Sequence, residues 1–304
     1  MNQPASTTQT REPLFDGDFL EQVQRLRLVA RRVAPRGRFA EQASKDRGAG
    51  LEFQDYRPYV PGDDLRAIDW TVYRRLGRVF LRLFEELEDL PVYLLPDISA
   101  SMWLEDPPRV RAGLQSALAL AAVALGQHDA VGVFPFANDL TILSRPKAGK
   151  SRIFTLAQQL QSLEPGGQTD LVTSMKRFQA MGLREGLAVV VSDFFDPGGV
   201  EAVAKALRGI RHRLLLVQLV RPSDRNPEQS LQGDLQLTDC ESGAVENVSL
   251  TPHVLERYRA SYDRFAQGLA DFASSRQAGL LALDTEGPVI DQIATLFEQG
   301  RYVV

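Results

Sequence analysis

The stretch YLLPDISASMWLED, residues 93–106, contains an apolar run that stops at an acid and is followed by serines at alternate positions. A continuous apolar run of this kind is typical of a strand that is covered by helices on both faces. Asp97, Ser99 and Ser101 would then lie where that strand ends, and open α/β sheets bind ligands at the carboxyl ends of their strands. We therefore expect a site here. The alternative is a polar loop in which the serines cap the next helix.

The chain repeats this pattern from residue 91 onward, where short apolar runs alternate with amphipathic segments of helical length. Strands are expected at Val92–Leu95, Ala130–Phe136, Leu140–Ser144, Leu187–Val191, Leu214–Val220 and Leu280–Leu283. Helices are expected at 109–127, 151–163, 170–181, 200–209, 253–276 and 288–298. The pattern predicts the α/β class, with a doubly wound, mainly parallel sheet. The stretch DLQLTDCESGAVENVSL, residues 234–250, predicts an inserted β-hairpin around Ser242 and Gly243.

Two further segments are expected before this domain. Residues 1–13 are polar and predict a disordered tail, and residues 14–90 predict a helix followed by an irregular or β extension. Asp18 and Glu21 resemble a capping box that opens the helix, and Pro35 ends it. The arginine-rich stretch at 25–38 is interpreted as a solvated helix face, with contact to an acidic partner or a membrane surface as the alternative. The stretch RVFLRLFEE, residues 78–86, fits a strand or a short helix. The expected organisation is therefore 1–13, 14–90 and 91–304.

Composition limits the class of protein. The 304 residues are 44% apolar and 24% charged, which is enough apolar content for a substantial core. The formal charge of −4 gives no overall attraction to nucleic acid or anionic lipid. The single Cys240 excludes an intramolecular disulfide and a thiolate metal cluster. The sequence has no run of 18 or more apolar residues, and its start lacks the pattern of a signal peptide. We expect a cytoplasmic protein without a membrane span or a nucleic-acid partner.

Two further loops place oxygen-bearing side chains at the ends of expected strands. Thr169 lies in PGGQTDL, residues 165–171, and Asp193 follows the apolar run LAVVVS, residues 187–192. Taken singly, each could be a helix cap or a turn acid. Hydroxyls and carboxylates without a neighbouring histidine or thiol suit a hard cation and argue against zinc. We expect Mg²⁺ or Mn²⁺, with Ca²⁺ as the weaker candidate, held by Asp97, Ser99, Ser101, Thr169 and Asp193. Such a site leaves room for an outside carboxylate.

This set of residues resembles a known site. The order of DISAS, then Thr169 after a double glycine, then Asp193 after a buried strand resembles the metal-ion-dependent adhesion site of von Willebrand factor A-type domains. The resemblance covers residues 91–304 and implies that the three hydroxyls are ligands, with both aspartates acting directly or through water. Pro96 and the stretch SDFF, in place of the more usual Asp-Gly, depart from the family pattern. Because proline lacks a backbone donor, we expect a slightly displaced strand end.

The block before the sheet has its own resemblance. GLEFQDYRPYVPGDDLRAIDW, residues 50–70, followed by DISASM, is similar to the signature of the bacterial family called domain of unknown function 58. The match runs from about residue 36 to the end of the chain. It implies a MoxR-type AAA+ ATPase as partner and a role in assembling or activating an unknown client protein. We expect acid–guanidinium pairs to pin this block onto the α/β domain. The alternative is that Asp63, Asp64 and Arg66 face outward and bind a partner.

The expected function is a non-enzymatic, metal-dependent interaction module, an adaptor that recognises an acidic residue on another protein. The alternative is a magnesium-dependent phosphohydrolase in which Asp97 accepts the phosphoryl group. Phosphatases that resemble haloacid dehalogenases place a second acid two positions later, where this chain has Ser99. General acid catalysis would therefore lack its donor. The sequence contains neither a P-loop motif nor a nucleophile elbow of the G-x-S-x-G type.

Overall fold

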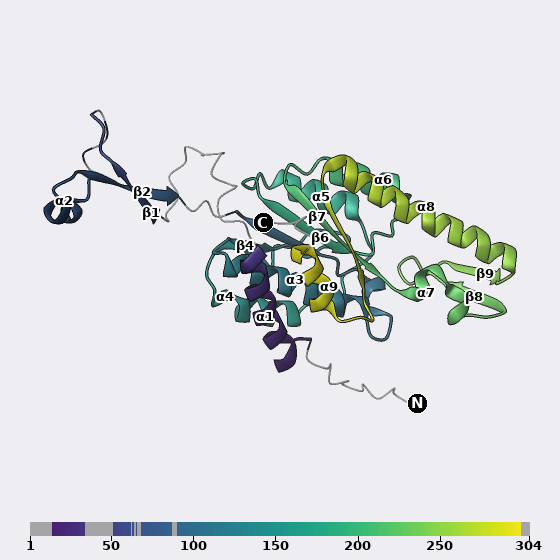
Figure 1. Ribbon diagram of the computed structural model, residues 1–304. Helices are drawn as coiled ribbons and strands as arrows, with labels where there is room; N and C mark the ends of the chain where they lie inside the picture. Colours follow the sequence, from purple (N-terminus) through teal and green to yellow (C-terminus); the bar gives the residue numbers. More distant parts are fainter. Residues whose placement is uncertain are drawn as a thin grey trace. The chain divides into compact units, whose positions relative to one another are not determined.

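The computed structural model describes residues 14–33, 51–61, 63, 65, 68–86 and 90–298. The chain divides into two compact units. The larger contains helix α1 (Gly17–Val33) and the residues from 90 onward, and the smaller lies within residues 36–89. Figure 1 shows the elements of each unit. None of the helices in the described ranges combines the length and the apolar character needed to cross a bilayer.

The larger unit is built around a six-stranded sheet in the order β10–β7–β6–β3–β4–β5. The strands are β3 (Val92–Pro96), β4 (Val131–Val133), β5 (Ser144–Lys147), β6 (Leu187–Ser192), β7 (Arg213–Val220) and β10 (Gly279–Asp284). All neighbours pair in parallel except the edge strand β5, which is antiparallel to β4. Every residue of β3 and β6 is buried, as expected for strands that are covered on both faces. The prediction of a doubly wound, mainly parallel α/β sheet is confirmed.

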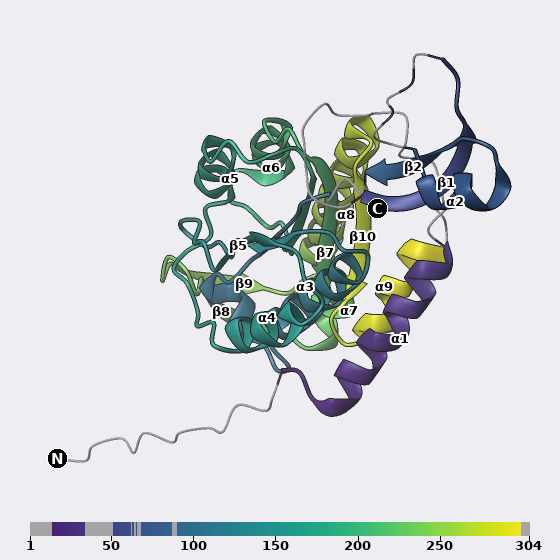
Figure 2. The ribbon, with the colours of Figure 1, turned by 90° about the vertical axis from the view of Figure 1, so that its left-hand side faces the viewer.

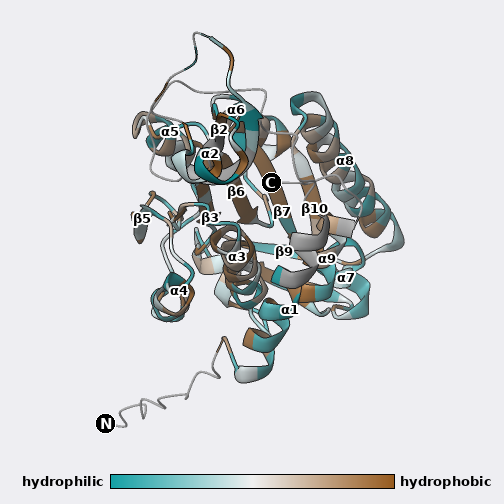
Figure 3. Cartoon of the chain, turned by 60° about the vertical axis from the view of Figure 1, so that its left-hand side comes forward, coloured by the Kyte–Doolittle hydropathy of each residue, from teal (hydrophilic) through white to brown (hydrophobic). Residues whose placement is uncertain are grey.

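Helices cover both faces of this sheet (Figure 2). One face is covered by α1, α3 (Arg109–Gly126), α4 (Arg152–Gln161) and α9 (Val289–Glu298). The other is covered by α5 (Leu171–Ala180), α6 (Gly199–Arg208) and α8 (Pro252–Arg276). Because side chains alternate along a strand, Val92 and Leu94 of β3 enter the first core, whereas Tyr93 and Leu95 enter the second. Figure 3 shows the resulting apolar character of the central strands.

Helix α3 is buried on almost all sides, which its sequence RVRAGLQSALALAAVALG permits. Alanines at many positions allow α1, α4 and α9 to pack closely around it while the leucines fill the core. The shorter elements of this unit are η2 (Ala100–Trp103), α7 (Pro222–Arg225) and η3 (Pro227–Gln229). They lie in loops that follow strands β3 and β7.

Three expected boundaries are wrong. The strand expected at Ala130–Phe136 covers only Val131–Val133, and Phe136 forms isolated bridges beyond it. The strand expected at Leu140–Ser144 begins only at Ser144, because Leu140 bridges back to Phe136 in a tight antiparallel turn before the regular ladder starts. The cap expected from Asp18 is supplied instead by Asp16, whose Oδ1 accepts a hydrogen bond from Phe19 N–H at 2.7 Å. Helix α1 therefore begins at Gly17.

The smaller unit contains strands β1 (Leu51–Pro58) and β2 (Phe80–Glu86), which pair antiparallel, and helix α2 (Trp70–Leu76) between them. The stretch at 78–86 is therefore largely strand. Asp69 caps α2, since its Oδ1 accepts hydrogen bonds from Thr71 N–H at 2.8 Å and Val72 N–H at 3.1 Å. The Tyr56 hydroxyl donates to Asp69 Oδ2 at 3.0 Å, which ties the helix cap to β1.

Asp63 makes its contacts inside this unit. Its carboxylate accepts a hydrogen bond from Val60 N–H at 2.9 Å and forms an ion pair with Arg57 at 2.7 Å. Both interactions lower the pKa of Asp63. These contacts pin a turn of the segment to its own strand. A partner contact through Asp63 stays a prediction, and Asp64 and Arg66 lie outside the described residues.

The inserted hairpin is present, as strands β8 (Asp234–Thr238) and β9 (Val245–Ser249). Their turn contains Ser242 and Gly243, and Gly243 has a φ of 72°, where glycine is favoured. Most side chains of both strands are exposed. The hairpin therefore adds little to the core.

Candidate metal site

The end of β3 carries the first of the expected site residues. Strands β3 and β6 pair in continuous register as far as Pro96 opposite Val191. One residue later, Asp97 N–H donates to Val191 O at 2.8 Å, and Asp97 forms a bridge with Phe136. The expected displacement of the strand end at Pro96 is therefore wrong, because pairing continues past the proline.

Asp97 is buried, and both of its carboxylate oxygens accept hydrogen bonds. Ser99 N–H donates to Oδ1 at 2.9 Å, and Ser192 Oγ donates to Oδ2 at 2.6 Å. The hydroxyl oxygens of Ser99 and Ser101 lie 3.1 Å apart. The loop therefore begins with Asp97, whose carboxylate is fixed by two hydrogen bonds, and it holds two serine hydroxyls close together.

The loop before α5 lies against the loop that follows β3. Gly166 N–H donates to Ile98 O at 2.7 Å. Glycine is required at this position, because a Cβ there would lie 2.4 Å from the Cβ of Ala137 and 3.1 Å from Ile98 O. This close approach brings Thr169 to the same edge of the sheet as the two serines. Its neighbour Asp170 is the N-cap of α5.

The end of β6 supplies Ser192, Asp193 and Phe194. Phe194 has a φ of 62°, in the left-handed region that costs free energy for a bulky residue. Its ring is only 2% exposed, and its N–H donates to Ser192 Oγ at 2.9 Å. Burial of the ring offsets the backbone cost and explains how SDFF takes the place of Asp-Gly. Asp193 itself accepts a hydrogen bond from Phe195 N–H at 3.0 Å through Oδ1.

The pKa values of both aspartates are raised. Burial raises the pKa of Asp97, and the charge of Glu241 adds to this rise, although hydrogen bonds from Ser192 and Ser99 oppose it. Burial and the charge of Asp97 raise the pKa of Asp193 from 3.8 to about 7, against smaller opposing effects of the hydrogen bond from Phe195 N–H and the charge of Arg109. Two carboxylates that repel each other in a desolvated place favour a cation between or beside them.

The donor set fits a hard divalent cation. The residues that would hold it are Ser99, Ser101 and Thr169 through hydroxyl oxygens, and Asp97 and Asp193 through carboxylate oxygens. Within the described ranges, no group of three or more His, Cys, Asp or Glu side chains is arranged to hold a metal. A cation here would therefore depend on the hydroxyls.

Sequence reasoning missed two residues at this site. Ser192 donates to Asp97, and its only signal was its place next to Asp193 at the end of an apolar run. Glu241, in the turn of the hairpin, accepts hydrogen bonds from Thr169 N–H at 2.9 Å and from Thr169 Oγ1 at 2.8 Å. No sequence signal links these two residues, because 72 positions separate them.

Comparison with known proteins identifies the family. The model of the family described as "Protein of unknown function DUF58" matches residues 55–267. The chain belongs to this family. This DUF58 protein is 28% identical over 245 residues to the uncharacterized protein Rv1480 of Mycobacterium tuberculosis, a match that covers 79% of this chain and 76% of that protein.

Solved structures similar to this DUF58 protein include two distant ones. The conserved hypothetical protein BatB from Bacteroides thetaiotaomicron matches with a TM-score of 0.41 and 16% identity, over 69% of this chain and 98% of that chain. Proximal thread matrix protein 1 from the mussel byssus, solved with a zinc-occupied MIDAS motif, matches with a TM-score of 0.39 and 11% identity, over 70% of this chain and 45% of that chain.

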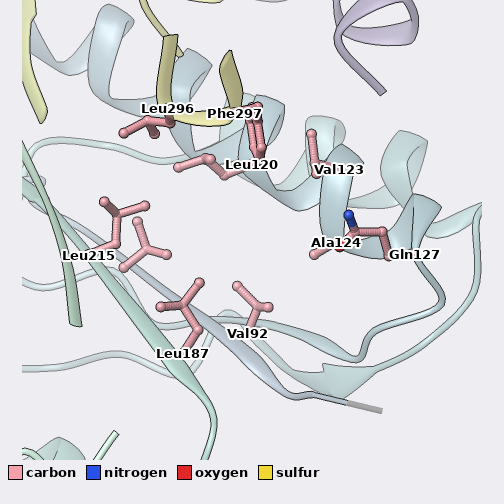
Figure 4. Close-up of a pocket in the computed structure, with 10 residues that line it drawn as sticks. Val92, Leu120, Val123, Ala124, Gln127, Leu187, Leu215, Leu296 and Phe297 are labelled. Atoms are coloured by element: carbon pink, nitrogen blue, oxygen red, sulfur yellow. The ribbon is translucent and has the colours of Figure 1, made fainter. Parts of the chain in front are cut away.

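A small apolar cavity of this DUF58 protein lies elsewhere, between α3, α9 and the sheet (Figure 4). Its lining includes Val92 and Leu187, the first residues of β3 and β6, so it lies toward the end of the sheet opposite the site. Its volume is about 20 Å³, and Gln127 is the one polar residue that lines it. Such a cavity is a packing defect rather than a ligand pocket.

Proposed function

We propose that this DUF58 protein is a non-enzymatic adaptor of the cytoplasm that binds an acidic side chain of another protein through Mg²⁺ or Mn²⁺. Its partners are a MoxR-type AAA+ ATPase and a client protein that the pair assembles or activates. The cation would be held by the hydroxyls of Ser99, Ser101 and Thr169. Asp97 and Asp193 would bind it directly or through water. When bound, it supplies positive charge that attracts a carboxylate.

One observation carries this proposal. Asp97 and Asp193 lie close enough for the charge of one to raise the pKa of the other, and Asp97 belongs to the loop that holds the paired hydroxyls of Ser99 and Ser101. Three hydroxyls and two aspartates leave room for a further oxygen ligand on the cation, and an outside carboxylate could fill that position. Thr169 also holds a carboxylate, that of Glu241, with both its N–H and its hydroxyl.

The phosphohydrolase alternative fits the geometry less well. Asp97 is 2% exposed, so a phosphoryl group has little access to its carboxylate oxygens. We expect purified protein with Mg²⁺ to release no more phosphate from aryl phosphates or nucleotides than an Asp97→Ala variant. Metal-dependent turnover that this variant loses would establish the alternative.

The adaptor proposal is tested by retention of partners from an extract of the host cells. Tagged wild-type protein is incubated with Mg²⁺ or with a chelator, beside Ser101→Ala and a surface control, Ser162→Ala. We expect a MoxR-type ATPase to be retained by the wild type and the control with Mg²⁺, and to be lost with the chelator or in Ser101→Ala. Retention that is equal in all samples would contradict a metal-dependent contact.

A further inference from the structure

The turn of the inserted hairpin reaches the candidate metal site. Both carboxylate oxygens of Glu241 accept hydrogen bonds from Thr169, at 2.9 Å from N–H and at 2.8 Å from Oγ1. Gln168 Nε2 donates to Glu241 O at 2.6 Å, so the backbone of the turn is also fixed to the loop before α5. A carboxylate of the chain itself thus lies on a hydroxyl of the proposed site.

The turn is built to present Glu241. Asp239 Oδ1 accepts a hydrogen bond from Glu241 N–H at 3.0 Å, and Asp239 N–H donates to Ala244 O at 2.8 Å. Gly243 N–H donates to Asp239 O at 2.8 Å and closes the turn. Since the strands of the hairpin leave most of their side chains exposed, core packing does not explain why this turn is ordered against the sheet edge.

The charge of Glu241 also acts on the buried acid of the candidate site. The negative charge of Glu241 acts on Asp97, which is itself close to Asp193. Glu241 and Asp97 therefore repel each other, although the acids in the described ranges form no group of three or more that could hold a metal. A divalent cation would convert this repulsion into attraction.

We propose that Glu241 is an internal ligand of the metal site, which occupies the position of the partner's carboxylate until the hairpin moves away. This inference rests on the proposed function, because it needs the cation. The hairpin is then a competitive inhibitor carried by the chain itself, and a partner binds only by displacing Glu241.

The test uses Mn²⁺ and acetate, with water-proton relaxation as the readout of water molecules on protein-bound Mn²⁺. Wild type is compared with Glu241→Gln, which keeps the shape of the side chain, and with Glu246→Gln, which removes the same charge from an exposed position of the same hairpin. We expect Glu241→Gln to weaken Mn²⁺ binding by roughly tenfold. We also expect acetate to displace water from Mn²⁺ in this variant and not in wild type or Glu246→Gln.

The outcomes separate the two proposals. Equal Mn²⁺ affinity and an equal response to acetate in all three proteins would overturn the role of Glu241 and leave the metal site standing. Absence of Mn²⁺ binding in all three would overturn the proposed function and this inference together. Circular dichroism checks that the variants are folded, and hydrogen exchange over residues 234–249 provides a second readout. Mn²⁺ should slow this exchange in the wild type and leave it unchanged in Glu241→Gln.

Discussion

Asp97 shows at the scale of one residue how the fold fixes the chemistry of the site. A buried carboxylate is costly unless hydrogen bonds satisfy it, and here Ser99 N–H and Ser192 Oγ satisfy one oxygen each. These bonds orient the carboxylate.

Replacement of Ser192 by alanine should destabilise the protein, because Asp97 Oδ2 would lose its buried donor. The expected loss in the free energy of unfolding is about 1–3 kcal/mol. Chemical denaturation measures this loss. Ser162→Ala is the control, because the exposed Ser162 hydroxyl donates to Gln159 O, at 2.8 Å, near the end of α4. The control should stay within about 0.5 kcal/mol of the wild type. A similar, small change in both variants would mean that the Ser192–Asp97 bond contributes nothing.

Asp193 should make metal binding depend on pH. Its pKa in the folded protein is about 7, above the ordinary value of 3.8, so the folded state binds a proton more tightly than the unfolded state. Without metal, the stability from this group is therefore present at low pH and falls as pH rises toward about 7. A cation binds the deprotonated form and should restore that stability.

Thermal unfolding with and without Mn²⁺ tests the direction of this pH dependence. The increase in Tm caused by Mn²⁺ should be larger at about pH 8 than at about pH 5.5. Asp193→Asn cannot titrate, so its response to Mn²⁺ should be smaller and nearly the same at both pH values. An Mn²⁺ effect in the wild type that is independent of pH would show that deprotonation of Asp193 is not coupled to metal binding.

At the scale of elements, the sequence predicts the helices and strands whose positions follow from the local pattern of apolar residues. The buried strands β3, β6 and β7 are predictable because they are covered on both faces and read as continuous apolar runs. The edge strand β5 was misplaced because Leu140 is buried by a turn rather than by regular pairing. The Thr169–Glu241 contact could not be predicted, since only the position of the hairpin relative to the sheet creates it.

Helix α1 is part of the core of the larger unit, although it precedes the sheet in sequence by a long segment. Leu26 is 2% exposed and packs in the same cluster as residues of α3 and α9. Leu26→Ala should lower the free energy of unfolding by about 2–5 kcal/mol. Gln24→Ala, on the exposed side of the same helix, should change it by less than about 0.5 kcal/mol. If the two variants unfold alike, α1 does not belong to this core.

At the scale of the whole molecule, the larger unit keeps its two cores apart from the candidate metal site. The two cores lie between the sheet and its helix layers, whereas the candidate site uses loops at the carboxyl ends of β3 and β6 and before α5. The inserted hairpin contributes to the site and little to the cores. Changes in the site loops can therefore alter binding while the cores keep the fold.

Calorimetric titration of Mg²⁺ and Mn²⁺ into the purified protein tests the candidate metal site directly. We expect binding with a modest Kd of roughly 0.1–1 mM, because a site that depends on hydroxyls holds a cation less tightly than a cage of carboxylates. We expect Thr169→Ala and Ser101→Ala to lose this binding and Ser162→Ala to keep it. A wild type that binds neither ion at millimolar concentration, or site variants that bind as the wild type does, would contradict the central claim.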